Sequence, residues 1–114
     1  MIIVVAKIIF NSRVERDRAI KLSAPIQKAT RDEEPGCLDY CFAADPCKGT
    51  VMQVYELWQD SDSLAAHFDH PNYQRMVELL GGCGFVDSIN RAYLTERDEP
   101  VYGEGGAKKT AFFT

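Results

Sequence analysis

Hydrophobic and polar residues alternate along the chain in segments that predict four strands. Residues 2–10 are β-branched and apolar at both alternating sets of positions, which predicts a strand buried on both faces. Residues 37–43, 50–58 and 85–95 predict three more strands. The turn residues at 45–49 join the second and third of these strands into a hairpin.

Between the strands, apolar residues recur at helical spacing in two regions. The first helix is predicted from about residue 13 to 33, with a kink at Pro25 and an end at Pro35-Gly36. The second begins after Asp60 or Ser61, is broken or restarted by Pro71, and stops at Gly81-Gly82. The buried stripe of the first helix is expected along Ile20, Ala24 and Gln27, with Leu22, Ile26 and Ala29 beside it; that of the second is expected along Leu64, His67, Phe68, Tyr73, Met76, Val77 and Leu80.

The resulting order, βαββαβ, is that of an α+β, ferredoxin-like fold with both helical regions on one face of a four-stranded antiparallel sheet. The first strand is apolar on both sides, so the helix-free face needs a cover, and a second copy packed sheet to sheet is the simplest one. We therefore expect a homodimer formed through the sheet faces. Residues 1–96 are expected to form this domain, and the Gly-rich segment 97–114 is expected to be a flexible tail or, through Val101-Tyr102 and Phe112-Phe113, a segment that docks on the partner.

Length and charge narrow the function classes. The 114 residues suit one globular domain, and a net charge of −4 with a pI near 5.1 argues against nucleic acid as the partner. The mixed-charge run 13–18 is expected to be a solvated helix face. No apolar run approaches the ~20 residues that span a bilayer, and no secretory signal is recognised, so we expect no membrane association and a cytoplasmic protein. The four cysteines lack the spacing of a zinc site and are expected to be free thiols.

Residue types that can act in catalysis or ligand binding are concentrated in three segments. These are Glu34-Pro35-Gly36-Cys37-Leu38-Asp39-Tyr40, Tyr55-Glu56-Leu57-Trp58-Gln59-Asp60, and the stretch from Leu64 through His67 to Pro71-Asn72-Tyr73. In order and spacing this pattern resembles the antibiotic biosynthesis monooxygenase family over residues 2–95. The resemblance implies a dimeric α/β barrel with a ligand pocket between sheet and helices. It leaves the substrate open, because the family includes cofactor-independent oxygenases, haem-degrading enzymes and an isomerase of a phosphorylated molecule.

The leading hypothesis is a monooxygenase that oxidises a phenolic or quinol-like aromatic molecule with O2 and needs no cofactor or metal. A deprotonated, electron-rich phenol can pass an electron to O2 directly, if the protein supplies a base, hydrogen-bond donors and a dry cavity. His67 is the candidate base, because an ordinary histidine has a pKa of about 6.5. Asn72, Tyr40 and Tyr55 are candidate donors, and Trp58, Phe42, Phe68 and Tyr73 are candidate aromatic walls.

Each of these residues also has a structural interpretation. His67 can be a core histidine bonded to a backbone carbonyl, His70 a surface or capping residue, and Asn72 a helix cap. Tyr40, Tyr55 and Trp58 can be ordinary packing residues, and Glu56 can be an ion-pair partner or a proton carrier.

Two other functions stay open at this point. An isomerase of a small, phosphorylated carbonyl compound needs a cation, and Lys7 is the one strand lysine placed for it if it faces the helices. A non-catalytic binding or stress-response module would hold a ligand without turnover, and a packed interior with no cavity around His67 would favour it. Haem degradation is disfavoured, because Lys7, His67 and Val77 stand where that branch of the family carries Asn, Trp and the iron-ligating His, and Trp58 is on a strand.

Overall fold

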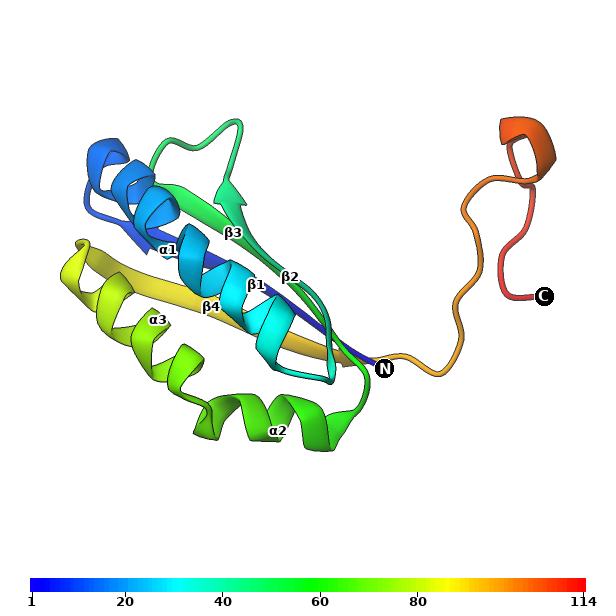
Figure 1. Ribbon diagram of the computed structural model, residues 1–114. Helices are drawn as coiled ribbons and strands as arrows, with labels where there is room; N and C mark the ends of the chain where they lie inside the picture. The colour runs from blue at the N-terminus through cyan, green and yellow to red at the C-terminus, as the bar shows by residue number, and fades with distance from the viewer.

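Four strands form one sheet in the computed structural model, which describes residues 1–114. The elements follow in the order β1 (Ile2–Phe10), α1 (Arg13–Glu33), β2 (Cys37–Ala44), β3 (Val51–Trp58), α2 (Ser61–Asp69), α3 (Pro71–Gly82) and β4 (Phe85–Leu94). Across the sheet the strand order is β2-β3-β1-β4, and every neighbouring pair is antiparallel. The predicted α+β, ferredoxin-like fold is confirmed, with the helices on one face of the sheet (Figure 1).

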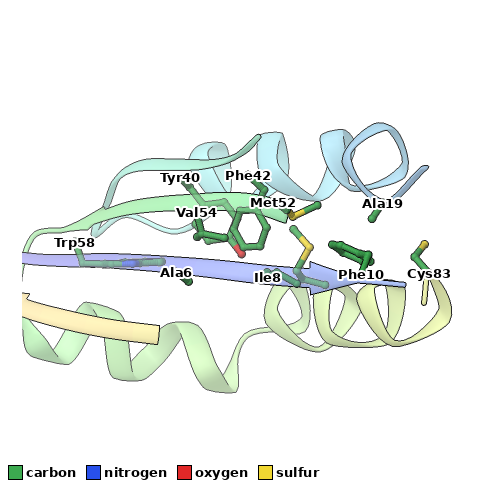
Figure 2. Packing of buried hydrophobic residues seen from close by; sticks show 11 residues of the cluster. Ala6, Ile8, Phe10, Ala19, Tyr40, Phe42, Met52, Val54, Trp58 and Cys83 are labelled. Carbon is green, nitrogen blue, oxygen red and sulfur yellow. The ribbon is translucent and has the colours of Figure 1, made fainter. Parts of the chain in front are cut away.

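The core lies between the sheet and the helices. Successive side chains of a strand point to opposite faces, so alternate residues of β1 and β3 reach the helical layer. These residues are buried, and Figure 2 shows them gathered with Tyr40 and Phe42 of β2: Ala6, Ile8, Phe10, Met52, Val54 and Trp58. The core therefore draws on three of the four strands.

The opposite face of the sheet carries no helix and is largely exposed. Val5, Tyr55, Ile89 and Tyr93 on this face are 36%, 39%, 59% and 51% exposed. The strand register places Val5 opposite Tyr55 on one side, and Lys7 opposite Ile89 on the other. Within one protomer β1 is thus buried on its helix-facing side alone, which differs from the burial on both faces that its sequence predicts.

Helix α1 buries only part of the stripe that its sequence predicts: Gln27 is buried, and Ile20 and Ile26 pack against the core, but Ala24 is exposed. Arg16, Ala19, Ser23, Gln27 and Thr30 are buried, whereas Leu22 is 43% exposed. The reason is that α1 covers β2, an edge strand with unpaired backbone groups. The Gln27 amide donates to the Phe42 carbonyl (3.2 Å) and accepts from the Phe42 N–H (2.9 Å), so a polar residue faces inward here.

Arg16 corrects the expectation of a solvated face at 13–18. Its side chain is buried, and Nη1 donates to the backbone carbonyls of Asp45, Lys48 and Val51 at 3.4, 3.1 and 3.0 Å. The Lys48 carbonyl also accepts from the Val51 N–H, and the Val51 carbonyl from the Asp45 N–H, so the guanidinium adds a charged donor to a turn that already has two backbone hydrogen bonds. Arg16 therefore fastens the hairpin turn to the start of α1.

Two helices replace the single interrupted helix at 61–82. Asp60 caps α2 by accepting from the Ser63 N–H at 2.8 Å. Pro71 is the first residue of α3, and the His70 Nδ1 caps this helix by accepting from the Asn72 N–H at 3.0 Å. The capping interpretation of His70 is therefore confirmed. Gly36 is required by the close approach of α2, since a Cβ there would meet the Ser63 side chain at 2.0 Å.

Residues 97–114 extend away from the sheet as an arm (Figure 1). The arm is closed on itself by a bridge between Tyr102 and Lys108 and by an ion pair of 2.7 Å between Lys109 Nζ and Glu99 Oε2. Its apolar residues Val101, Tyr102, Phe112 and Phe113 are each about half exposed or more. None of the helices in the chain combines the length and apolar character needed to cross a membrane.

Candidate active site

A cavity of about 720 Å³ lies between the sheet and the helices α2 and α3. Its volume falls in the range of pockets that hold small organic ligands. Hydrophobic residues make up 14 of the 20 that line it, so a molecule inside contacts mainly apolar side chains. The sheet contributes Val4, Ala6, Ile8, Tyr40, Phe42, Val54, Glu56, Phe85, Ser88, Asn90, Arg91 and Ala92, and the helices contribute Leu64, His67, Phe68, Tyr73, Met76, Val77, Leu80 and Gly81.

His67 enters the cavity from α2 and is held by a buried carboxylate. Its Nδ1 lies 2.7 Å from Oε1 of Glu34, which ends α1, and the two side chains are 4% and 7% exposed. A proton on Nδ1 that is donated to Glu34 leaves the other ring nitrogen, Nε2, as the basic one. This is the arrangement of an oriented general base.

Glu34 is itself fixed by a polar network behind the cavity. Its second oxygen, Oε2, accepts from the Asn72 Nδ2 at 3.2 Å and lies 3.9 Å from the His70 Nδ1. Asn72 is fully buried at the start of α3, and its amide oxygen accepts from the Arg75 guanidinium. Asn72 therefore acts on His67 through Glu34.

Aromatic rings enclose His67 on several sides. The Trp58 ring centroid lies 4.7 Å from that of His67, and those of Tyr40 and Tyr73 lie 5.5 Å away. Phe68 lies 6.1 Å from His67 and packs against Tyr73. These rings restrict the imidazole to one orientation and exclude water from its faces.

Glu56 is a second carboxyl group at the cavity wall. It comes from β3, is 8% exposed, and its Oε1 accepts from the Trp58 Nε1 at 2.9 Å. Burial raises the pKa of Glu56 to about 7, with a further rise from the charge of Glu34, while the hydrogen bond from Trp58 opposes the rise. Glu56 therefore exchanges its proton near neutral pH.

The His67 Nε2, the Glu56 Oε2 and the Tyr40 hydroxyl have no hydrogen-bond partner in the protein. Every fully enclosed side-chain nitrogen or oxygen has a partner, so these three are reached from the cavity that their residues line. Burial, followed by the charges of Glu56 and Glu34, raises the pKa of Tyr40, so its hydroxyl stays protonated and can donate. The cavity thus combines apolar walls with a base, an acid and a donor.

Of the predicted site residues, five line the cavity together: His67, Tyr40, Phe42, Phe68 and Tyr73. Trp58 and Asn72 lie behind it and support Glu56 and Glu34. Tyr55 and Lys7 are on the helix-free face of the sheet, so neither reaches the cavity of its own protomer. The isomerase alternative therefore loses the cation on which it was based, and the open cavity beside His67 removes the main argument for a non-catalytic module.

Glu34 is the site residue that sequence reasoning did not select. It is separated from His67 by 33 positions, and nothing in the pattern of either segment shows that the two meet. Glu56 could have been selected from the sequence. It alternates with Val54 and Trp58 along β3, so it lies on the face of the strand that points to the helices. The described residues include no group of three or more His, Cys, Asp or Glu side chains placed to hold a metal ion.

Solved structures of several proteins share this fold. A candidate antibiotic biosynthesis monooxygenase from Deinococcus radiodurans is 22% identical, with a TM-score of 0.79 over 90% of this chain and all of the other. SnoaB, a cofactor-independent oxygenase from Streptomyces nogalater, is 13% identical, with a TM-score of 0.65 over 87% of this chain and 96% of the other. At these identities the likeness shows the fold alone.

Sequence comparison gives the closer assignment. An uncharacterized protein from Synechocystis is 32% identical over 64 residues, which are 56% of this chain and 43% of that relative, so the match spans less than half of the relative's length. The family model for antibiotic biosynthesis monooxygenases matches residues 1–79, which hold β1 through most of α3 and both Glu34 and His67. The chain therefore belongs to the antibiotic biosynthesis monooxygenase family.

Proposed function

We propose that this protein is a monooxygenase that oxidises a small phenolic or quinol-like molecule with O2 and without a bound cofactor. Family membership supports an oxygenase, and SnoaB, a relative in fold, is a cofactor-independent oxygenase. The observation that carries the proposal is His67, held by Glu34 with its free nitrogen reached from an apolar cavity. Such a base is what an electron-rich hydroxyarene needs before it can react with O2.

In this reaction the His67 Nε2 takes the proton of the substrate hydroxyl. The resulting anion transfers one electron to O2, and the aryloxyl radical and superoxide combine to form a carbon–oxygen bond. Loss of water from the hydroperoxide then leaves a carbonyl group. One oxygen atom of O2 stays in the product, and the other leaves in water with two hydrogens of the substrate.

The remaining cavity residues orient the substrate and stabilise its charge. Tyr40 donates a hydrogen bond to the anionic oxygen, and this bond is strong because the apolar walls exclude water. Phe42, Phe68 and Tyr73 provide edges and faces for a planar ring. Asn72 keeps Glu34 in place and thereby fixes His67.

The proposal includes a homodimer in which a second copy covers the helix-free face of the sheet, as in a dimeric α/β barrel. The exposed Val5, Tyr55, Ile89 and Tyr93 are apolar or aromatic and lie on that one face. Exposed apolar residues gathered on one sheet face are typical of an interface, and a twofold axis lets the same patch serve both copies. Residues 1–96 form the catalytic unit in this proposal, and the arm at 97–114 is free to contact the partner.

The decisive measurement is oxygen consumption with a panel of hydroquinones and polycyclic phenols. Wild type is expected to consume O2 with at least one of them, and His67→Ala to be slower by about 10²- to 10⁴-fold, the usual contribution of a general base. Asp69→Ala is the matched control, because Asp69 is exposed on the same helix and does not line the cavity. Equal rates in wild type and His67→Ala would remove His67 from the mechanism, and no consumption with any substrate would refute the oxygenase.

A further inference from the structure

Glu56 is the one buried carboxyl group of the cavity wall that the proton transfer to His67 does not use. It projects from β3 toward the helices, and its Oε1 is fixed by the Trp58 indole. Its Oε2 has no partner in the protein and is reached from the cavity. Glu56 forms no ion pair with any Lys, Arg or His side chain.

The groups around Glu56 oppose a negative charge on it. Burial raises the pKa of Glu56 to about 7 against the opposing hydrogen bond from Trp58, and the charge of Glu34, the residue that orients His67, adds to the rise. From β2, Tyr40 and Cys37 are neutral, because burial and the nearby carboxylates raise the pKa of each. His67 faces the cavity from α2 and Tyr73 from α3, whereas Arg91 of β4 pairs with Val5, and its side chain is therefore directed to the helix-free face. The charge of Glu34 and the burial of Glu56 therefore both favour the protonated form of the Glu56 carboxyl group.

We propose that Glu56 is the second proton-transfer group of the cavity, giving its proton to the oxygen adduct while His67 holds the proton taken from the substrate hydroxyl. This inference rests on the proposed function and goes beyond it by assigning the acid. The geometry that supports it is an open Oε2 on a carboxyl fixed through its other oxygen, in the same cavity as the base.

The proton transfers balance over one turnover. His67 first takes the hydroxyl proton, and after O2 adds, Glu56 protonates the peroxide anion to give a hydroperoxide. The Glu56 carboxylate then removes the hydrogen on the carbon that bears the hydroperoxide, and the electron pair of that C–H bond forms the carbonyl as the O–O bond breaks. The departing hydroxide takes the proton from His67 and leaves as water, so both residues return to their starting forms.

The first test follows the carboxyl carbon of Glu56 by NMR in the full chain, free and with 4-nitrophenol as the probe. The free protein is expected to show one glutamate that titrates near pH 7 and is missing from the spectrum of Glu56→Gln. Saturating probe is expected to move this titration upward, since a bound phenolate next to Oε2 makes ionisation of Glu56 harder. A titration in the ordinary glutamate range, or one that the bound probe does not move, overturns the proposal.

The second test separates proton transfer from binding. Glu56→Gln keeps an oxygen for the Trp58 N–H and can still donate a hydrogen bond, but it cannot release a proton. It is expected to bind 4-nitrophenol within about threefold of wild type while kcat for oxygen consumption falls about 10²-fold or more. Glu78→Gln, on the exposed side of α3, is the matched control and is expected to match wild type in both.

The outcomes distinguish the two proposals. An unchanged kcat in Glu56→Gln, with an active wild type, overturns the role of Glu56 and leaves the oxygenase intact. A wild type that consumes no O2 refutes the oxygenase, and the carboxyl titration with and without probe then decides by itself whether Glu56 exchanges its proton with a bound oxygen. A probe that does not bind contradicts both proposals.

Discussion

The His67 imidazole lies against the Trp58 indole, with ring centroids 4.7 Å apart and ring planes inclined by 39°. The same indole donates from Nε1 to the Glu56 Oε1 at 2.9 Å. One fully buried tryptophan thus contacts both of the groups that we assign to proton transfer, one through its ring face and the other through its N–H.

Trp58→Phe should raise the pKa of Glu56 above its value of about 7 in wild type. The Trp58 hydrogen bond favours the ionised carboxylate, so its removal leaves burial and the charge of Glu34 unopposed. Carboxyl-carbon NMR titration of the two proteins measures the change. A pKa that falls in Trp58→Phe would show that Trp58 does not stabilise the ionised form.

Glu34→Gln should lower the rate of O2 consumption by about tenfold or more, because an uncharged amide orients the histidine but does not stabilise its protonated form. Single-turnover rates with the best substrate of the panel provide the measurement. Asp32→Asn is the neighbouring control, since Asp32 is exposed and its carboxylate pairs with Lys28 of the same helix. Similar losses in both variants would mean that the effect comes from the end of α1 in general.

Wild type should lose stability between about pH 5 and pH 8 through Glu56. Below the ordinary glutamate pKa both the folded and the unfolded chain hold this proton, and above about pH 7 neither does. Between these values the folded chain binds more protons, so its free energy of unfolding falls as the pH rises. The rise in pKa from 4.5 to about 7 corresponds to about 3 kcal/mol.

Urea unfolding at a series of pH values measures this loss, and Glu56→Gln removes the group that titrates. The difference in free energy of unfolding between wild type and variant should therefore grow in favour of the variant with rising pH. A difference that is constant from pH 5 to pH 8 would contradict the raised pKa of Glu56.

Arg16→Met should destabilise the fold by roughly 1–3 kcal/mol, because three backbone carbonyls of the β2–β3 turn lose a charged donor, while those of Lys48 and Val51 keep their backbone partners. Arg18→Met, at an exposed position of the same helix, should change the free energy of unfolding by less than about 0.5 kcal/mol. Chemical denaturation of the two variants makes the comparison. Equal stabilities would mean that water replaces the guanidinium in the turn.

Ile89→Glu should convert the proposed homodimer into monomers at micromolar concentration. Ile89 is 59% exposed in one protomer, so the charge leaves the protomer folded but must be buried in a sheet-to-sheet interface. Val14→Glu, at a 77% exposed apolar residue of α1, is the control and should not alter the assembly. Light scattering of wild type that finds only monomers would refute the interface.

The fold was predictable from the sequence because its signals are local. Each strand was found within one residue of its observed ends, and Asp60 and Pro71 marked the starts of α2 and α3. The exposure of Arg16 and the burial of Leu22 and Ala24 were predicted wrongly, because what faces inward along α1 depends on the edge of β2 and on an irregular turn. A hydrophobic pattern along α1 contains no information about either.

The candidate site was predictable only in part, for a similar reason. His67 and the aromatic residues could be selected by residue type, whereas the role of Glu34 depends on its contact with His67, 33 positions away in the sequence. Tyr55 and Lys7 were assigned to the wrong face of the sheet, because a shift of one position along a strand reverses the face to which a side chain points. An aromatic or basic residue in the right segment can therefore lie on the wrong side of the sheet.

The alternation along β1 has a consequence for how such a protein can diversify. Ala6 faces the cavity, while its neighbours Val5 and Lys7 face the other way. Substitutions at even-numbered positions can reshape the chamber to suit a new substrate without altering the surface that meets a partner, and odd-numbered positions offer the reverse freedom. Along this nine-residue strand, substrate specificity and assembly thus depend on two different, alternating sets of residues, which can change independently.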